Sequence, residues 1–242
     1  MPAPPPPPSL PPGAALLLDL DGTLLDLAAT PDGVRVPEGL PATLLALRGR
    51  LGDALAIVTG RPVAQVDALL PGVPYAVAGE HGGAIRFAPA AEEERVALPP
   101  LPPSWREAAA ALVAAHPGTL LEEKARGFAV HYRLAPGAGP ALERALAALL
   151  DGQATHRLLP AHMALEVRPR GADKGTAVTA LLARAPFAGR RPVYIGDDVT
   201  DEDAIRVAGA RGGLGLRVAE AFGDAAGVRA WLGRLTAGAS MT

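Results

Sequence analysis

The strongest constraint in this chain is an apolar run near the N-terminus that meets two aspartates. The run from Ala14 to Leu20 is apolar except for Asp19, and Asp21-Gly22-Thr23 follows it. A short run of this kind is typical of a strand buried on both faces of a parallel sheet. Two neighbouring carboxylates at its end repel each other and are costly to bury unless a cation neutralises them. Taken alone, the pattern also fits a strand end followed by an ordinary turn.

Strand and helix signals alternate along most of the chain. This alternation predicts an α/β fold with a Rossmann-like parallel sheet, and ligands of such sheets bind outside the carboxyl ends of the strands. The expected elements are strands at 14–20, 54–59, 75–78, 84–87, 192–195 and 213–218, and helices at 40–51, 63–70, 174–185, 200–208 and 225–235.

The pattern changes in the middle of the chain. Ser104 and Glu107 form a capping-box pattern at the start of a predicted helix. The order helix, hairpin, helix and strand pair predicts a small inserted α+β module. Its expected elements are helices at 104–116 and 140–150, a hairpin at 119–124 and 127–134, and strands at 155–159 and 162–168.

These patterns divide the chain into segments. Residues 13–98 and 169–242 are expected to form the core, and 99–168 the inserted cap. The proline-rich residues 1–12 favour an extended polyproline II tail that packs no core, so we expect them to be disordered. Residues 90–103, with several prolines, are expected to be a hinge or linker into the cap.

Composition narrows the classes of function. The chain has 242 residues, a net charge of −2 and no cysteine. Near-neutral charge argues against a general nucleic-acid or membrane-surface binder. Without thiolates, any metal must be held by oxygen or imidazole, which favours Mg²⁺, Ca²⁺ or Mn²⁺. The sequence shows neither a bilayer-spanning stretch nor a signal-peptide pattern, so we expect a cytoplasmic protein, and we expect a monomer.

Three further segments place polar side chains at the ends of predicted elements. Thr59-Gly60-Arg61 ends a strand, where the hydroxyl can donate to a phosphate oxygen or cap the next helix. Lys174 opens a helix, where its charge opposes the dipole unless an anion compensates it; an exposed lysine is the alternative. Gly196 to Asp203 carries five acids in seven positions, which exceeds what capping requires and indicates a metal site.

In their order, these four segments resemble the motifs of the haloacid-dehalogenase-like phosphatase superfamily. The resemblance implies that Asp19 is the nucleophile and forms an aspartyl-phosphate. Asp21 would protonate the leaving oxygen and then deprotonate the attacking water. Thr59 and Lys174 would hold the transferring phosphoryl oxygens.

The resemblance also implies Mg²⁺ as the cofactor. The ion would be bound by Asp19, by the backbone carbonyl of Asp21 and by Asp197. Asp198 and Asp201 would lie nearby, as direct ligands or acting through water, with Asp201 the candidate for the second shell. The charge of the metal ion would offset the repulsion between an anionic nucleophile and an anionic substrate.

The inserted module resembles the cap of trehalose-6-phosphate phosphatases. The match spans residues 16–208, and it predicts hydrolysis of trehalose 6-phosphate in trehalose biosynthesis. The segments that carry it are the hairpin at 121–133, Glu166 to Pro169, Glu80 to Gly83 and Gly196 to Ala204. The sugar-contacting residues that it implies are Glu122, Lys124, Arg133 and Glu166 in the cap, with Gly60 and Arg61 as candidates from the core.

Other functions share parts of this pattern. Sucrose-phosphate and glucosyl- or mannosyl-phosphoglycerate phosphatases, like phosphomannomutases, have a related core and cap. A catalytically silent sugar-phosphate-binding module is a second alternative, although such a module has no need of a nucleophile at Asp19. A receiver domain would also use clustered acids and a lysine, but it predicts a shorter chain without a cap.

Overall fold

The chain folds into two compact units. The computed structural model describes residues 9–28, 33–124 and 126–237. One unit, called the core unit below, combines the residues up to 96 with those from 173 onward. The other, called the cap unit, contains residues 97–172, so it begins two residues before and ends four residues after the expected limits.

The core unit is built on a seven-stranded sheet with the order β11-β10-β1-β2-β3-β4-β5. The strands from β11 to β3 are parallel, and β4 and β5 extend the sheet in antiparallel fashion. The predicted α/β fold with a parallel sheet is confirmed. The strands are β1 (Ala14–Leu18), β2 (Leu55–Val58), β3 (Ala76–Gly79), β4 (Ala84–Arg86), β5 (Glu94–Arg95), β10 (Arg191–Gly196) and β11 (Leu214–Arg217).

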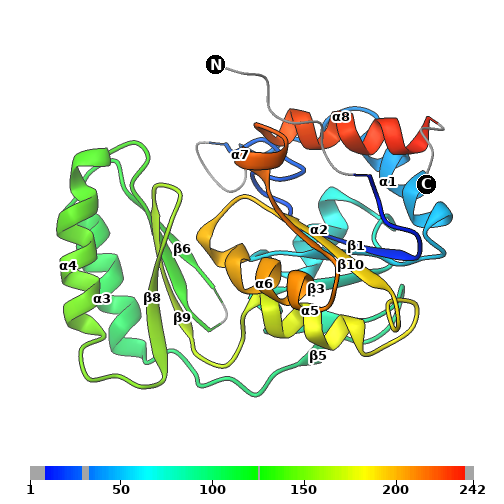
Figure 1. Ribbon diagram of the computed structural model, residues 1–242. Coiled ribbons are helices and arrows are strands. Elements are labelled where there is room, and N and C mark those ends of the chain that lie inside the picture. The colour runs from blue at the N-terminus through cyan, green and yellow to red at the C-terminus, as the bar shows by residue number, and fades with distance from the viewer. Residues whose placement is uncertain (1–8, 29–32, 125, 238–242) are drawn as a thin grey trace. The chain divides into compact units, whose positions relative to one another are not determined.

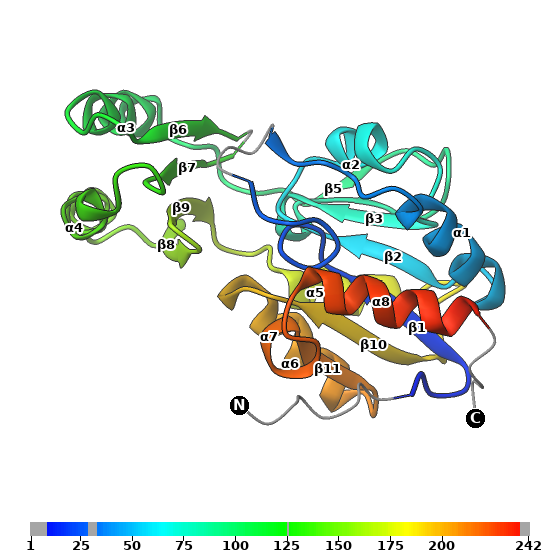
Figure 2. The same ribbon diagram turned by 90° about the horizontal axis from the view of Figure 1, so that it is seen from above.

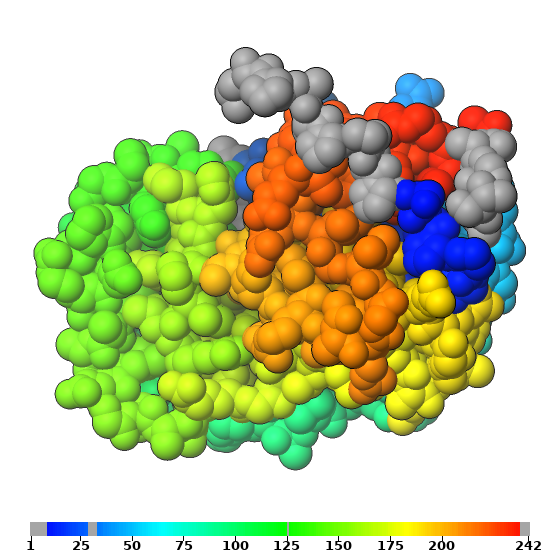
Figure 3. All heavy atoms as spheres, in the orientation of Figure 1, coloured from blue at the N-terminus to red at the C-terminus, as the bar shows by residue number. Residues whose placement is uncertain are grey.

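Helices cover both faces of this sheet. Helices α1, α2 and α8 lie on one face, and α5 and α6 lie on the other (Figures 1 and 2). Figure 3 shows α6, β11 and α7 forming the surface drawn in orange. The helices are α1 (Leu40–Arg50), α2 (Val63–Leu69), α5 (Lys174–Leu182), α6 (Glu202–Ala210), α7 (Val218–Ala221) and α8 (Ala225–Thr236), with short 3₁₀ turns η2 (Glu80–Gly82) and η4 (Val199–Asp201).

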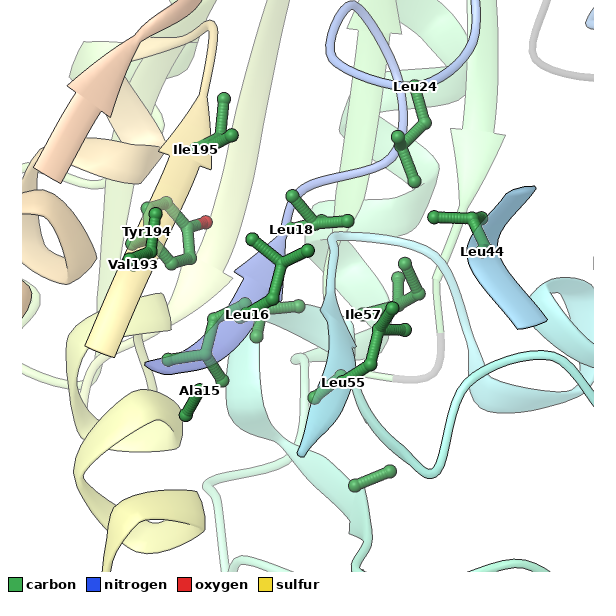
Figure 4. Packing of buried hydrophobic residues seen from close by; sticks show 14 of the residues in the cluster. Ala15, Leu16, Leu18, Leu24, Leu44, Leu55, Ile57, Val193, Tyr194 and Ile195 are labelled. Atoms are coloured by element: carbon green, nitrogen blue, oxygen red, sulfur yellow. The ribbon is translucent and has the colours of Figure 1, made fainter. Parts of the chain in front are cut away.

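The first strand is the centre of the hydrophobic core. Every residue of β1 is buried, because its two neighbours in the sheet and the helices on both faces enclose it. Figure 4 shows Leu16 and Leu18 packing among side chains of β2 and β10, among them Ile57 and Tyr194. Burying a leucine side chain contributes roughly 1.5–3 kcal/mol, so β1 is firmly held. The position of Asp19, directly after β1, is therefore fixed by the core.

The cap unit has an antiparallel sheet with the order β6-β7-β9-β8. Helices α3 and α4 pack on one face of it (Figure 2). Phe128, Val130 and Val167 of the sheet are buried against Trp105 and Leu142 of the helices. The elements are α3 (Pro103–Ala114), β6 (Leu120–Glu123), β7 (Phe128–His131), η3 (Pro136–Ala138), α4 (Gly139–Leu149), β8 (His156–Ala161) and β9 (Ala164–Pro169).

Two expectations for the entry to the cap differ from the structure. Helix α3 begins at Pro103 after Pro102 and no side chain caps it, so Ser104 is not the N-cap. Proline suits the first helical position because its missing N–H needs no partner there. The expected linker at 90–103 contains β5, which pairs with β4 and is held by an ion pair between Glu94 and Arg184.

The N-terminal expectation also needs correction. Residues 1–8 of the expected disordered tail lie outside the described residues. Within the rest of it, Leu10 is only 1% exposed and packs in the core, and the carbonyl of Pro11 accepts a hydrogen bond from Ala14. The packed chain therefore starts before residue 12. Among the described helices, none combines the length and apolar character that crossing a membrane requires.

Candidate active site

A buried ammonium group lies between two carboxylates at the carboxyl end of the core sheet. The Nζ atom of Lys174 donates to Oδ1 of Asp19 and to Oδ1 of Asp201, both at 2.7 Å. The side chains of Lys174, Asp19 and Asp201 are at most 4% exposed. Oδ2 of Asp19 accepts a second hydrogen bond from the hydroxyl of Thr23 at 3.2 Å. Burial on this scale requires the charges to be paired, and these contacts pair them.

Three elements bring these groups together. Strands β1 and β10 are parallel neighbours, so Asp19 and Asp197 emerge side by side at their carboxyl ends. Helix α5 begins at Lys174 itself, and Asp173 caps it in a reciprocal capping box with Thr176. The carboxylate of Asp173 therefore satisfies the first turn of the helix, and Lys174 can turn its ammonium group toward the strand ends.

Asp201 is held on both of its oxygens. Oδ1 accepts from Lys174 and from the hydroxyl of Tyr194 on β10, and Oδ2 accepts from the backbone N–H of Asp198 at 3.0 Å. A Cβ atom on Gly196 would lie 2.2 Å from Cγ of Asp201, so only glycine leaves room for this side chain. Asp201 thereby orients the ammonium group of Lys174 toward Asp19.

The electrostatics of the cluster reveal an excess of negative charge. Burial raises the pKa of Asp19, reinforced by Asp201 and Asp197 and opposed by Lys174. Burial of its carboxyl group and the charge of Asp201 raise the pKa of Asp197 to about 7, although the residue as a whole is exposed. Burial acts to lower the pKa of Lys174, but Asp19 and Asp201 raise it, so the ammonium form is stable. One ammonium group thus faces three carboxylates.

The excess charge fits a metal ion. Carboxylate oxygens of Asp19, Asp197 and Asp201 lie within 4.8 Å of one another. Gly22 has a φ of +79°, and a Cβ atom there would lie 2.0 Å from Oδ2 of Asp197, so only glycine fits at this position of the loop. Oxygen donors of this kind suit a hard divalent cation. Asp201 is the least available of the three, since its oxygens accept three hydrogen bonds and those of Asp19 accept two, so Asp19 and Asp197 are the better candidates to bind the ion.

Asp198 caps the turn that leads into α6. Its Oδ1 accepts from the N–H of Val199 at 2.7 Å, and the residue caps the 3₁₀ turn η4. The sequence left open whether Asp198 or Asp201 lies closer to the ion; in the structure Asp201, three positions later, is the one that joins the acidic cluster. The expected helix at 200–208 begins instead as this turn and continues as α6, and this geometry turns Asp201 inward.

The remaining core candidates lie at the ends of β1 and β2. Arg61 donates from Nε to Oδ2 of Asp21 at 2.6 Å and from Nη2 to Oδ1 at 2.8 Å, which is a bidentate ion pair. Thr59 is buried, and its Oγ1 accepts from the backbone N–H of Arg61 at 3.2 Å. Its own hydroxyl hydrogen is thus directed away from this contact. Gly60 packs closely on His81, whose Nε2 would lie 2.6 Å from an added Cβ.

Three of the four sugar-contacting residues predicted for the cap lie close together. Glu122 on β6 and Glu166 on β9 are both in register with Ala129 of β7, on the face opposite the helices. Nζ of Lys124 donates to Oε1 of Glu166 at 2.7 Å. Arg133 lies farther along the sheet, where Nη2 is 3.5 Å from the carbonyl of His162. We call Glu122, Lys124, His131 and Glu166 the polar face of the cap.

Three contacts at these sites were not expected from the sequence. Thr23 donates to Asp19, Tyr194 donates to Asp201, and Nε2 of His131 lies 2.8 Å from Oε2 of Glu122. In the sequence, Thr23 is part of a turn and Tyr194 is part of a buried strand. Their contacts with the acids could not be predicted, because only the tertiary fold brings their hydroxyls to the carboxylates. His131 lies in the predicted hairpin, but its partner Glu122 is nine residues away on the other strand.

Comparison with known proteins decides the family. The sequence matches the model of the trehalose-phosphatase family over residues 17–222, which spans both units. The chain belongs to the trehalose-phosphatase family. Trehalose phosphatases are phosphoric monoester hydrolases, so the predicted enzyme class and family are confirmed.

Individual relatives agree with this assignment. A probable trehalose-phosphate phosphatase of Sinorhizobium fredii is 44% identical over 208 residues, which cover 84% of this chain and 77% of the relative. The trehalose-6-phosphate phosphatase of Escherichia coli is 34% identical with the same coverage. The C-terminal domain of the trehalose-6-phosphate phosphatase of C. albicans superposes with a TM-score of 0.78 over 94% of this trehalose-phosphatase chain and 93% of that domain, at 23% identity.

The raised pKa of Asp197 makes a prediction about metal binding. Because the proton must leave before the carboxylate can bind a cation, affinity for a divalent cation, with Mg²⁺ as the test ion, should fall as the pH falls below about 7. We expect the dissociation constant to rise on the order of tenfold between pH 7 and pH 5.5, with proton release on binding. Calorimetric titration in buffers of different ionisation enthalpy measures both.

The control is Asp53→Asn, in a turn where asparagine also tolerates the φ of +68°; this half-exposed side chain accepts a hydrogen bond from Arg48, which an amide oxygen can also accept. This variant should bind Mg²⁺ like the wild type, whereas Asp197→Asn should bind weakly and release fewer protons. Equal affinity of the wild type at both pH values would contradict the assignment of Asp197.

Proposed function

We propose that this chain hydrolyses trehalose 6-phosphate to trehalose and phosphate through an aspartyl-phosphate intermediate, with Mg²⁺ as cofactor. The observation that carries the proposal is the match to the trehalose-phosphatase family across both units. Relatives that cover most of this chain are named for that activity. The buried Lys174–Asp19 pair supplies a mechanism for phosphate-ester cleavage, and the polar face of the cap supplies groups that recognise a sugar.

Asp19 is the proposed nucleophile. Lys174 favours the ionised form of Asp19 through its charge, and it remains close enough to donate to a phosphoryl oxygen as negative charge develops there. An Asp19 oxygen bonds to phosphorus while the bond from phosphorus to the sugar oxygen breaks. The hydroxyl of Thr59, at the end of the neighbouring strand β2, is the second donor proposed for the transferring phosphoryl group.

Asp21 is the proposed acid and base. It gives a proton to the departing sugar oxygen, and it then takes one from the water that attacks the phosphorus of the intermediate. Arg61 donates to both Asp21 oxygens in this structure. Arg61 therefore has to yield one hydrogen bond before Asp21 can carry a proton, and a substrate phosphate is an anion that can draw the guanidinium away.

Mg²⁺ fits the acidic cluster at the end of β1 and β10. Asp19, Asp197 and the backbone carbonyl of Asp21 would hold it, while Asp201 acts through Lys174. When bound, the ion supplies the positive charge that lets an anionic carboxylate approach an anionic phosphate ester.

The polar face of the cap is the proposed sugar-recognition surface. Carboxylates accept hydrogen bonds from sugar hydroxyls, and ammonium and guanidinium groups donate to them. Although burial acts in the opposite direction, Glu166 and Glu122 raise the pKa of Lys124, which therefore remains a cation. Glu122, Lys124 and Glu166 can thus offer fixed acceptors and a fixed donor to a disaccharide with many hydroxyls.

A substrate panel tests the activity. We expect phosphate release from trehalose 6-phosphate to be faster than from sucrose 6-phosphate or glucose 6-phosphate, and to stop when Mg²⁺ is removed by a chelator. Asp19→Asn should lower kcat by about 10⁴-fold or more, because nucleophile losses in other enzymes are of this size. Asp53→Asn is the matched control and should keep full activity. Equal rates on all three sugars would contradict the proposed substrate.

The cap residues make a separate prediction. Glu166→Ala should raise KM or lower kcat for trehalose 6-phosphate, so that kcat/KM falls by about 10²-fold, and should leave slow hydrolysis of a small aryl phosphate unchanged. The control is Glu123→Ala, whose side chain is exposed and pairs with Arg106. Equal losses on both substrates would show that Glu166 supports the fold rather than recognition of the sugar.

A further inference from the structure

The two glutamates of the polar face are each held by a basic side chain of the same sheet. Glu122 and Glu166 lie on either side of Ala129, since β6 and β9 both pair with β7 at that residue. Lys124 holds Glu166 through Oε1. His131, two residues beyond Ala129 on the same face of β7, contacts Glu122 at 2.8 Å.

The hydrogen bond from His131 has a defined direction. An ionised carboxylate can only accept, so Nε2 of His131 carries the hydrogen and donates it to Oε2 of Glu122. Burial acts to raise the pKa of Glu122, but the His131 hydrogen bond and the charge of Lys124 lower it, which keeps the carboxylate ionised. Within the described residues, no hydrogen bond reaches Oε1 of Glu122, so this oxygen is available to a ligand.

The pairing of the strands lets the imidazole of His131 hold the carboxylate of Glu122 in one orientation. His131 is directly opposite Leu120, whereas Glu122 is opposite Ala129, so the imidazole reaches the carboxylate diagonally across the hairpin. Both side chains are partly buried, with 23% and 28% exposed. A glutamate side chain has three rotatable torsions, and fixing one of its oxygens limits the directions in which the other can point.

We propose that His131 is a positioning residue for the sugar, which orients Glu122 so that Oε1 accepts a substrate hydroxyl. This inference rests on the proposed function, because it assumes a sugar phosphate on the polar face. His131 acts through Glu122 and touches no reacting atom. His131 acts by preorganisation. Because Glu122 is already ordered before the sugar binds, the entropic cost of ordering this side chain does not weaken binding.

A purely structural role is the rival interpretation. In that case the His131–Glu122 contact would only stabilise the hairpin of β6 and β7, as cross-strand pairs do. The two interpretations differ in what the contact affects. A structural role changes the thermal stability of the cap and impairs every substrate, whereas a positioning role changes KM for a substrate with a sugar and leaves a small aryl phosphate unaffected.

The test compares two variants of His131 in the full chain. His131→Phe keeps a ring of similar size but removes the donor, and His131→Gln places an amide N–H where Nε2 lies. We expect His131→Phe to raise KM for trehalose 6-phosphate about tenfold with kcat within about twofold, and His131→Gln to restore KM to within about threefold. Both variants should hydrolyse the aryl phosphate and melt like the wild type.

The controls are the same two substitutions at His162, an exposed residue in the turn between β8 and β9. They should leave all parameters unchanged. Unchanged KM for trehalose 6-phosphate in His131→Phe, or equal losses on both substrates without rescue by glutamine, would overturn the inference. Failure of the wild type to hydrolyse trehalose 6-phosphate would instead refute the proposed substrate, and KM for whichever sugar phosphate is cleaved would then decide the role of His131.

Discussion

A lysine ammonium group enclosed by two aspartates holds the candidate active site together. Lys174 reaches this position because α5 starts at that residue, and Asp19 reaches it because β1, buried throughout, ends one residue earlier. Neither charge could be buried alone at an acceptable cost. Tyr194 and the N–H of Asp198 complete the arrangement by holding Asp201 against the ammonium group. The strand ends, the helix start and the acidic turn therefore depend on one another.

The residues proposed for the chemistry and those proposed for sugar recognition lie in different units. The core unit contains the ion cluster, the Asp21–Arg61 pair and the proposed donors to the phosphoryl group. The cap unit contains a sheet that is apolar toward α3 and α4 and polar on its other face. Two glutamates on that face are each held by a basic partner, Lys124 or His131. Under the proposed function, changes in the cap would alter the substrate without disturbing the nucleophile.

Local patterns predicted the fold and the position of the acids, but not how the acids pair. The apolar run before Asp19 and the acidic run after β10 predicted that these acids lie close together, because the carboxyl ends of parallel strands meet at one edge of the sheet. Arg61 and Asp21 are 40 residues apart, and their contact depends on how the chain leaves β2 for α2. Asp198 and Asp201 were indistinguishable in sequence, since a single 3₁₀ turn decides which one points inward. Proline at the start of α3 outweighed the capping pattern of Ser104.

The covalent intermediate on Asp19 is the central claim, and trapping it is the most direct test. In Asp21→Asn, a small aryl phosphate needs no acid to leave, but the intermediate lacks the base for its hydrolysis. Acid quenching, digestion and mass spectrometry should find about one phosphate per chain on the peptide that contains Asp19, and borohydride should convert that residue to homoserine. Release of the aryl alcohol without a phosphorylated Asp19 peptide at any quench time would contradict the account.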